Sequence, residues 1–310
     1  MSRDTIRPDV QALLDLLATT PLAQLGELSV QETRAISKQM RTAPVDDGLV
    51  SICDISFTHS GEEIGLRCYN ADNKDAPAPL ILFFHGGGFV MGDLDSHHEL
   101  CRTIAYEMDI PLVAVDYRLA PEHPWPAAPD DAEAAARWIV ANASDELGVS
   151  LSGLVLAGDS AGANLAAVTA RALIDNPADV ALIGQFLIYP CVSLGQERPS
   201  MRENAEGYFL TRKALDWFTL NYNAPIDDPR FDLFAFDQTG MPPTLLVTAG
   251  LDPLRDEGRA YATCLIEAGV PTVYQEAVGN IHGCFSMVAA IPSTKRDVER
   301  ALAALSVLIS

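Results

Sequence analysis

Short and mostly continuous apolar runs recur along the chain from residue 79 onward. They lie at 79–84, 112–115, 154–157, 183–189 and 244–248. Runs of this length with few polar positions are typical of strands that are buried on both faces of a parallel sheet. Stretches with helical periodicity lie between and after them, at 97–108, 129–142, 161–175, 255–268 and 293–308. This alternation predicts an α/β fold in which helices flank a mostly parallel central sheet.

The chain before residue 79 has a different pattern. Residues 51–57 and 64–69 alternate apolar and polar positions, which predicts two half-buried antiparallel strands. Residues 72–79 contain two prolines and several charged or small residues, and this composition predicts a surface connection. Nearer the start, an apolar stripe that includes Val10 and Leu14 predicts helix between residue 5 and about residue 45.

Two segments do not fit the alternation of strands and helices. One is the helical segment 1–45, and the other is 191–225, which is rich in aromatic residues such as Trp217 and Phe218. We expect both to pack together as a helical cap over the edge of the sheet where the strands end. The catalytic domain is then expected to span 46–310, with 191–225 as its second cap segment.

Composition and charge narrow the class of protein. Hydrophobic residues make up 48% of the 310 residues and charged residues 20%, as in globular proteins with a buried core. The net charge of −21 disfavours nucleic acids and anionic membrane surfaces as partners. The six cysteines show no CxxC spacing, so we expect free thiols. Without an apolar segment of ~20 residues, the sequence predicts no membrane span, and its polar start predicts a cytoplasmic location.

The sequence Gly158-Asp159-Ser160-Ala161-Gly162 follows one predicted buried strand and begins the next helix. In a sharp strand-to-helix turn, flanking glycines avoid the clashes that Cβ atoms would make, and the serine side chain is exposed. The helix N-terminus there also favours negative charge. The pattern predicts that Ser160 is a nucleophile; the alternative is a glycine-rich turn with an incidental serine.

A second glycine-rich segment, His85-Gly86-Gly87-Gly88-Phe89, follows the predicted strand 79–84. Three glycines allow backbone N–H groups to point at a developing oxyanion. The hole is expected to combine two N–H groups of this loop with that of the residue after the nucleophile, Ala161. A phosphate-binding loop is less favoured, because no Lys-Ser or Lys-Thr pair and no GxGxxG spacing is present.

A serine nucleophile needs a histidine base and an acid that orients it. In the expected order of serine, acid and histidine, His282 is the one histidine that follows Ser160. Asp252 comes just after the predicted strand 244–248 and is the candidate acid. Its rivals Asp256 and Glu257 lie at the start of the next helix, where acids commonly serve the helix dipole.

Other residues with reactive side chains are interpreted as structural. His97 and His98 are expected to be helix-surface or packing residues, since no metal-ligand spacing surrounds them and no metal site is predicted. Cys284 is interpreted as a pocket or core thiol rather than as a nucleophile. The segment 116–128 is interpreted as an architectural loop that leaves a strand.

The chain resembles the bacterial hormone-sensitive-lipase-like carboxylesterases, a family with the α/β-hydrolase fold. The segments that carry the resemblance are 85–89, 116–128, 158–162, 252–258 and the loop around His282. The resemblance implies a catalytic triad of Ser160, His282 and Asp252. It also implies an oxyanion hole formed by the N–H groups of Gly87, Gly88 and Ala161. Hydrolysis of short-to-medium acyl esters, a helical cap and no cofactor are further implications.

Several aspects of function stay open at this point. The alternatives to an esterase are a non-catalytic small-molecule receptor on the same fold, an amidase or peptidase, and a lipase. Candidate substrate-contacting residues, each equally compatible with core or cap packing, are Phe89, Tyr189, Tyr208, Phe209, Leu210 and Phe285. An exposed edge strand or the last helix could also pair two copies of the chain as a homodimer.

Overall fold

The computed structural model describes residues 5–21, 25–39, 48–70 and 77–310, and these residues contain an eight-stranded sheet. The strands are β1 (Ile52–His59), β2 (Glu62–Tyr69), β3 (Ala78–Phe84), β4 (Leu112–Asp116), β5 (Leu151–Asp159), β6 (Leu182–Ile188), β7 (Thr244–Leu251) and β8 (Thr272–Ile281). Their order across the sheet is β1-β2-β4-β3-β5-β6-β7-β8. β2 is antiparallel to both β1 and β4, whereas β4 and all later neighbours are parallel. The predicted fold class is confirmed.

The central strands divide their side chains between two buried layers. Along β3, Leu80, Leu82 and Phe84 face one layer, while Ile81 and Phe83 face the other. Successive side chains of a strand point to opposite faces, so a strand covered on both sides must be apolar at every position. This requirement explains the continuous apolar runs of the sequence.

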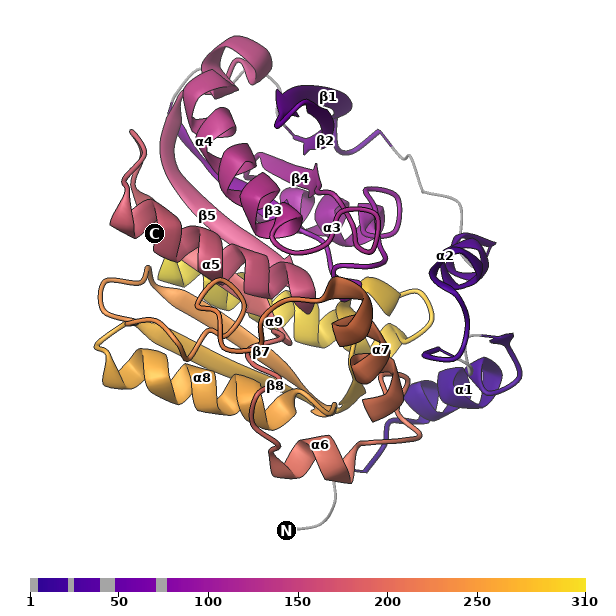
Figure 1. Ribbon diagram of the computed structural model, residues 1–310. Coiled ribbons are helices and arrows are strands. Elements are labelled where there is room, and N and C mark those ends of the chain that lie inside the picture. The colour runs from indigo at the N-terminus through magenta and orange to yellow at the C-terminus, as the bar shows by residue number, and fades with distance from the viewer. Residues whose placement is uncertain (1–4, 22–24, 40–47, 71–76) are drawn as a thin grey trace.

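Helices cover both faces of the sheet, as Figure 1 shows. The front layer consists of α4 (Ala127–Leu147), α5 (Ala161–Asp175) and α8 (Arg255–Glu267). The rear layer consists of α3 (His98–Met108) and α9 (Lys295–Leu308). Two short 3₁₀ helices, η2 (Cys284–Met287) and η3 (Pro292–Thr294), lead from β8 into α9.

The strand β8 is a correction to the sequence prediction, which has no strand at 272–281 and places a loop at 279–283. β8 lies at the edge of the sheet and pairs with β7 alone. Most of its first residues are only half-buried. An edge strand of this kind needs no continuous apolar run. Polar residues such as Gln275 and Glu276 interrupt the apolar pattern, so no strand is predicted from it.

The remaining helices lie at one side of the sheet in Figure 1. They are α1 (Pro8–Leu17), α2 (Val30–Gln39), α6 (Pro199–Glu203) and α7 (Arg212–Tyr222). In the described residues, the single helical stretch predicted before residue 45 therefore contains two helices, and Gly26, between them, has a φ of +95°. Residues 22–24 and 40–47, and most of the predicted connection 72–79, lie outside the described residues.

The two predicted cap segments contact each other. The indole Nε1 of Trp217, in α7, donates to the Leu28 carbonyl at 3.1 Å. Lys213 forms an ion pair with Glu27. The helix α1 instead packs toward β8 and α9, where Arg7 pairs with Asp297 at 2.6 Å. Within the part of the chain that the structure describes, no helix is both long and apolar enough to cross a bilayer.

Candidate active site

Ser160 lies in a tight turn between the end of β5 and the start of α5. Its backbone has φ 55° and ψ −118°, a conformation that L-residues rarely adopt. The turn brings the backbone of Gly162 against Phe84, so a Cβ on Gly162 would lie 1.9 Å from the Phe84 carbonyl oxygen. A Cβ on Gly158 would lie 2.4 Å from the carbonyl of Gly162. Both glycines of the motif are therefore required by close backbone approach.

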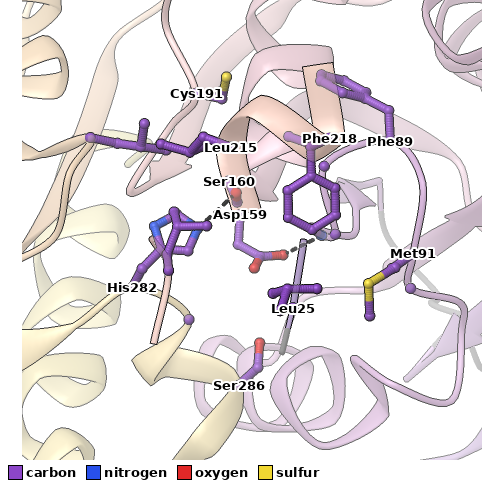
Figure 2. A pocket seen from close by; sticks show the side chains of 18 of the residues that line it. Leu25, Phe89, Met91, Asp159, Ser160, Cys191, Leu215, Phe218, His282 and Ser286 are labelled. Atoms are coloured by element: carbon purple, nitrogen blue, oxygen red, sulfur yellow. Dashed lines mark hydrogen bonds between the residues drawn. The ribbon is translucent and has the colours of Figure 1, made fainter. Parts of the chain in front are cut away.

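The side chains of Ser160, His282 and Asp252 form one continuous hydrogen-bond relay. Ser160 Oγ lies 2.8 Å from Nε2 of His282, and Nδ1 of the same ring lies 2.7 Å from Oδ2 of Asp252. Figure 2 shows the His282 ring beside Ser160. Asp252 follows β7 and His282 follows β8, so the topology brings together residues that are far apart in sequence.

Asp252 is held in place by its own surroundings. The side chain is fully buried, and its Oδ1 accepts from the Leu254 N–H at 2.8 Å, which leaves Oδ2 for His282. The rival acids have other partners. Asp256 accepts from the Ser200 N–H, and Glu257 accepts from the Val192 N–H at 2.6 Å.

The glycine-rich segment 86–91, called the oxyanion loop below, lies beside Ser160. Gly87 and Gly88 have φ values of +119° and +61°, and the Met91 N–H donates back to the Gly87 carbonyl at 2.8 Å. A Cβ on Gly87 would lie 2.2 Å from the Met91 carbonyl oxygen. The fold of the loop thus depends on glycine at this position.

Asp159, the residue before the serine, fastens the oxyanion loop to β5. Its Oδ1 accepts from the Gly86 N–H at 2.7 Å and lies 3.0 Å from Nε2 of His97. Burial raises the pKa of Asp159, but the charge and hydrogen bond of His97 and the Gly86 N–H outweigh it, so the pKa is lowered. His97, expected to be a surface or packing residue, thus lies at the site, where its ring contacts Asp159 and lines the cavity.

His85 begins the glycine-rich segment as a buried, neutral side chain. Burial lowers its pKa to about 4. Its Nδ1 lies 2.8 Å from the Gly86 carbonyl, which can only accept, so the ring proton is on Nδ1. Its ring stacks on Tyr117, whose hydroxyl donates to the His85 carbonyl at 2.7 Å. These contacts hold the start of the oxyanion loop in place. Neither His85 nor Tyr117 is among the described residues that line the cavity.

A cavity of about 200 Å³ opens over Ser160 between the oxyanion loop and α7. Leu25, Phe218 and Met91 lie on the far side of Ser160 from His282, as Figure 2 shows. The side chains of the wall are mainly apolar, and the polar end of the cavity is formed by the glycine loop, Ser160 and His282. Among the described residues, no group of three or more His, Cys, Asp or Glu side chains could hold a metal ion.

Comparison with known proteins identifies the family. A family model described as the alpha/beta hydrolase fold matches residues 81–286. Esterase LipI of Mycobacterium tuberculosis is 37% identical, over 96% of this chain and 94% of its own. The chain belongs to the hormone-sensitive-lipase-like carboxylesterases. This carboxylesterase is therefore an enzyme of the carboxylic ester hydrolase class.

Two further relatives of the carboxylesterase agree with this family. Ethyl acetate hydrolase of Pseudomonas putida is 37% identical, over 97% of this chain and 98% of its own. An ester hydrolase from the metagenome of Lake Arreo, solved in complex with a derivative of bipyridine phosphonate, superimposes with a TM-score of 0.89. The two chains are 36% identical, and the match covers 98% of this chain and 99% of that one.

Three of the six residues proposed for substrate contact lie in the wall of the carboxylesterase's cavity. These are Phe89, Phe209 and Leu210. The other three candidates, Tyr189, Tyr208 and Phe285, are not among the wall residues that the structure describes. The ring of Tyr189 instead packs 4.7 Å from that of His282, and Phe285 meets Tyr189 edge-on. Wall residues that the sequence did not indicate are Leu25, Met91, Leu215, Phe218, Leu254 and Met287.

Proposed function

We propose that the carboxylesterase hydrolyses short-to-medium acyl esters through a covalent acyl-enzyme formed on Ser160. The observation that carries this proposal is the relay from Ser160 through His282 to Asp252, with distances of 2.8 and 2.7 Å. A nucleophile within hydrogen-bond reach of a base, with an acid orienting that base, is the arrangement that acyl transfer requires.

In the acylation step, Ser160 Oγ attacks the ester carbonyl and transfers its proton to Nε2 of His282. Asp252 accepts from Nδ1 and so keeps the free lone pair of Nε2 directed at the serine. The negative charge that develops on the carbonyl oxygen is bound by the N–H groups of Gly87, Gly88 and Ala161. Each such donor stabilises the transition state by roughly 3–4 kcal/mol in a comparable site.

The intermediate then collapses and His282 returns its proton to the alcohol oxygen, which leaves as the free alcohol. In deacylation, His282 removes a proton from water as the water attacks the acyl carbonyl. The same three N–H groups bind the second oxyanion. The bond between the acyl carbon and Oγ of Ser160 then breaks, His282 returns its proton to Oγ, and the acid product is released.

The dimensions of the cavity support small esters as substrates. Its volume of about 200 Å³ is below the range of roughly 300–1,000 Å³ that is usual for ligand pockets. The groups at its polar end suit one carbonyl, and its apolar wall suits a short acyl or alcohol chain. A relative carries the name ethyl acetate hydrolase, which supports the same substrate class.

The first experiment replaces the nucleophile. Ser160→Ala is expected to lower kcat for p-nitrophenyl acetate by at least roughly 10³-fold, because no other group supplies the covalent step. A fluorophosphonate is expected to label Ser160 in the wild-type protein and nothing in the variant. Near-normal turnover by Ser160→Ala would show that the assignment is wrong.

A substrate series separates the competing activities. We expect kcat/KM to fall beyond medium chain lengths in p-nitrophenyl acetate, hexanoate, octanoate and palmitate, and to be much lower for a matched anilide. Preference for the palmitate would indicate a lipase, and preference for the anilide an amidase. Ligand binding without turnover of any ester would indicate a receptor.

A further inference from the structure

Arg34, on α2, reaches across to the oxyanion loop. Its Nε donates to the Val90 carbonyl at 2.8 Å, and its Nη2 donates to the Ala120 carbonyl at 2.8 Å. Both acceptors belong to buried residues, where a carbonyl without a donor is costly. One guanidinium therefore joins the N-terminal segment to the oxyanion loop, which lines the cavity, and to the loop that contains Ala120.

The same guanidinium also pairs with a carboxylate. Nη1 and Nη2 lie 3.0 and 2.9 Å from the two carboxylate oxygens of Glu122. The hydrogen bond from Arg34 lowers the pKa of Glu122. Because both side chains are part-exposed, at 30% and 45%, the ion pair itself contributes little stability. Its main effect is to orient the fork so that Nε and Nη2 meet the carbonyls.

The Val90 carbonyl is well placed to control the oxyanion loop. Gly86 is fastened to Asp159 at the start of the loop, and the Phe89 carbonyl accepts from the Ala120 N–H at 2.9 Å. The N–H groups of Val90 and Met91 both donate to the Gly87 carbonyl. Movement of the peptide that Arg34 holds would therefore be transmitted to Gly87 and its neighbour Gly88.

The segment that carries Arg34 is itself docked on the second cap segment. Ser29 and Glu32 bond reciprocally at the start of α2, as in a capping box, which fixes where the helix begins. Trp217, in α7, donates to the Leu28 carbonyl just before this turn. Leu25, from the same segment, lies in the cavity wall. The segment thus contacts α7, the cavity and the oxyanion loop together.

We propose that Arg34 is a positioning residue of the carboxylesterase. From the cap it holds the oxyanion loop in the geometry that directs the Gly87 and Gly88 N–H groups at the substrate oxygen. Turnover then depends on the docking of α2, although α2 supplies no group to the chemical step. This inference rests on the proposed function, because it assumes that the loop binds the oxyanion.

The test compares Arg34→Gln with a matched arginine of the cap. Arg212→Gln removes exposed ion pairs of α7 with Glu197 and Asp216, away from the oxyanion loop. Active sites are counted by fluorophosphonate titration, so that unfolded protein does not enter kcat. Misplacement of a loop by 1 Å can cost about 10²-fold in rate. We expect kcat per titrated site to fall roughly tenfold in Arg34→Gln, with KM within about twofold.

Arg34→Lys is expected to recover only part of this loss, since an ammonium cannot reproduce the planar fork. Hydrogen exchange of the peptide 85–92 is expected to speed up in Arg34→Gln and to stay unchanged in Arg212→Gln. An unchanged kcat per titrated site in Arg34→Gln, whatever its melting temperature, would overturn the proposal, and so would unchanged exchange at 85–92. Near-normal turnover by Ser160→Ala, or a wild-type protein that no fluorophosphonate labels, would instead mark failure of the proposed function.

Discussion

Several non-glycine residues near Ser160 and His282 have backbone conformations that L-amino acids disfavour. Phe89, Ser160 and Tyr189 all have positive φ, at 63°, 55° and 36°, and they follow β3, β5 and β6. Non-glycine residues in this region are strained by about 1–3 kcal/mol each and cluster at functional sites. In Ser160 and Tyr189 the strained backbone directly follows the last residue of a strand, next to His282.

Gly162 offers the sharpest test of this local geometry. A Cβ 1.9 Å from a main-chain oxygen cannot be relieved by a side-chain movement. Gly162→Ala is expected to lower the free energy of unfolding by roughly 3 kcal/mol or more, measured by urea denaturation, with loss of esterase activity. Gly195→Ala is the control, since its Cβ would meet nothing nearer than 3.6 Å. A Gly162→Ala variant with unchanged stability would contradict the described elbow.

At the scale of elements, α7 determines how much room the substrate has. Its inner side places Phe218 directly against the oxyanion loop, where a Cβ on Gly88 would lie 2.3 Å from the ring. Its outer side exposes Leu220, which is 78% accessible. The helix begins where Thr211 accepts from the Ala214 N–H, so its rotation is fixed from its first turn.

Phe218→Ala is expected to shift substrate preference toward longer esters. Removing the ring extends the cavity, and one methylene in an apolar pocket is worth about 1–3 kcal/mol in discrimination. The ratio of kcat/KM for p-nitrophenyl hexanoate to that for the acetate is expected to rise roughly tenfold. Leu220→Ala, on the same helix, is expected to leave the ratio unchanged. Equal ratios in both variants would exclude Phe218 as a determinant of chain length.

At the scale of the whole molecule, buried polar contacts fasten the segment 191–225, expected to be part of a cap, to the residues around β7 and α8. Glu257, in α8, accepts from the Val192 N–H at the start of this segment. The Asn204 amide donates to the Asp252 carbonyl at 3.0 Å, and Ser200 donates to the Pro253 carbonyl at 2.7 Å. The cap is therefore tied to the same loop that holds the acid of the relay.

The buried Glu257 makes stability depend on pH. Burial raises its pKa from 4.5 to about 8, so the folded chain binds this proton more tightly than the unfolded chain. Its contribution is full below pH 4.5 and is lost as the pH rises through about 8. Glu257→Gln keeps an oxygen acceptor without the charge. The melting temperature of the variant relative to wild type is expected to increase between about pH 5 and pH 9.

A matched variant checks this pH dependence. Glu299→Gln changes an exposed glutamate of α9 and is expected to give a difference that stays nearly constant with pH. If Glu257→Gln also gave a constant difference, Glu257 would not be the group that titrates.

The sequence by itself determined the fold class, because strands covered on both faces must be apolar throughout. It also singled out Ser160, Asp252 and His282 as candidates, since glycines at a strand-to-helix turn and the order of residues are local features. The distances among these side chains were decided by tertiary structure. They depend on β7 lying beside β6 and on β8 lying beside β7, and β8 is an edge strand whose polar residues interrupt the apolar pattern of a strand.

The tertiary structure alone decided the cavity wall and the links between the cap and the oxyanion loop. Arg34 and Phe218 belong to helices whose apolar and charged positions suit a surface helix equally well, and Leu25 lies in the turn before α2. Their roles come from which helix face meets which loop, a long-range packing choice that no local pattern encodes. The same reason separates Phe89, in the wall, from Tyr189, which packs behind His282. The candidate catalytic residues can be recognised from local sequence, whereas the shape of the pocket depends on contacts between segments that are distant in the sequence.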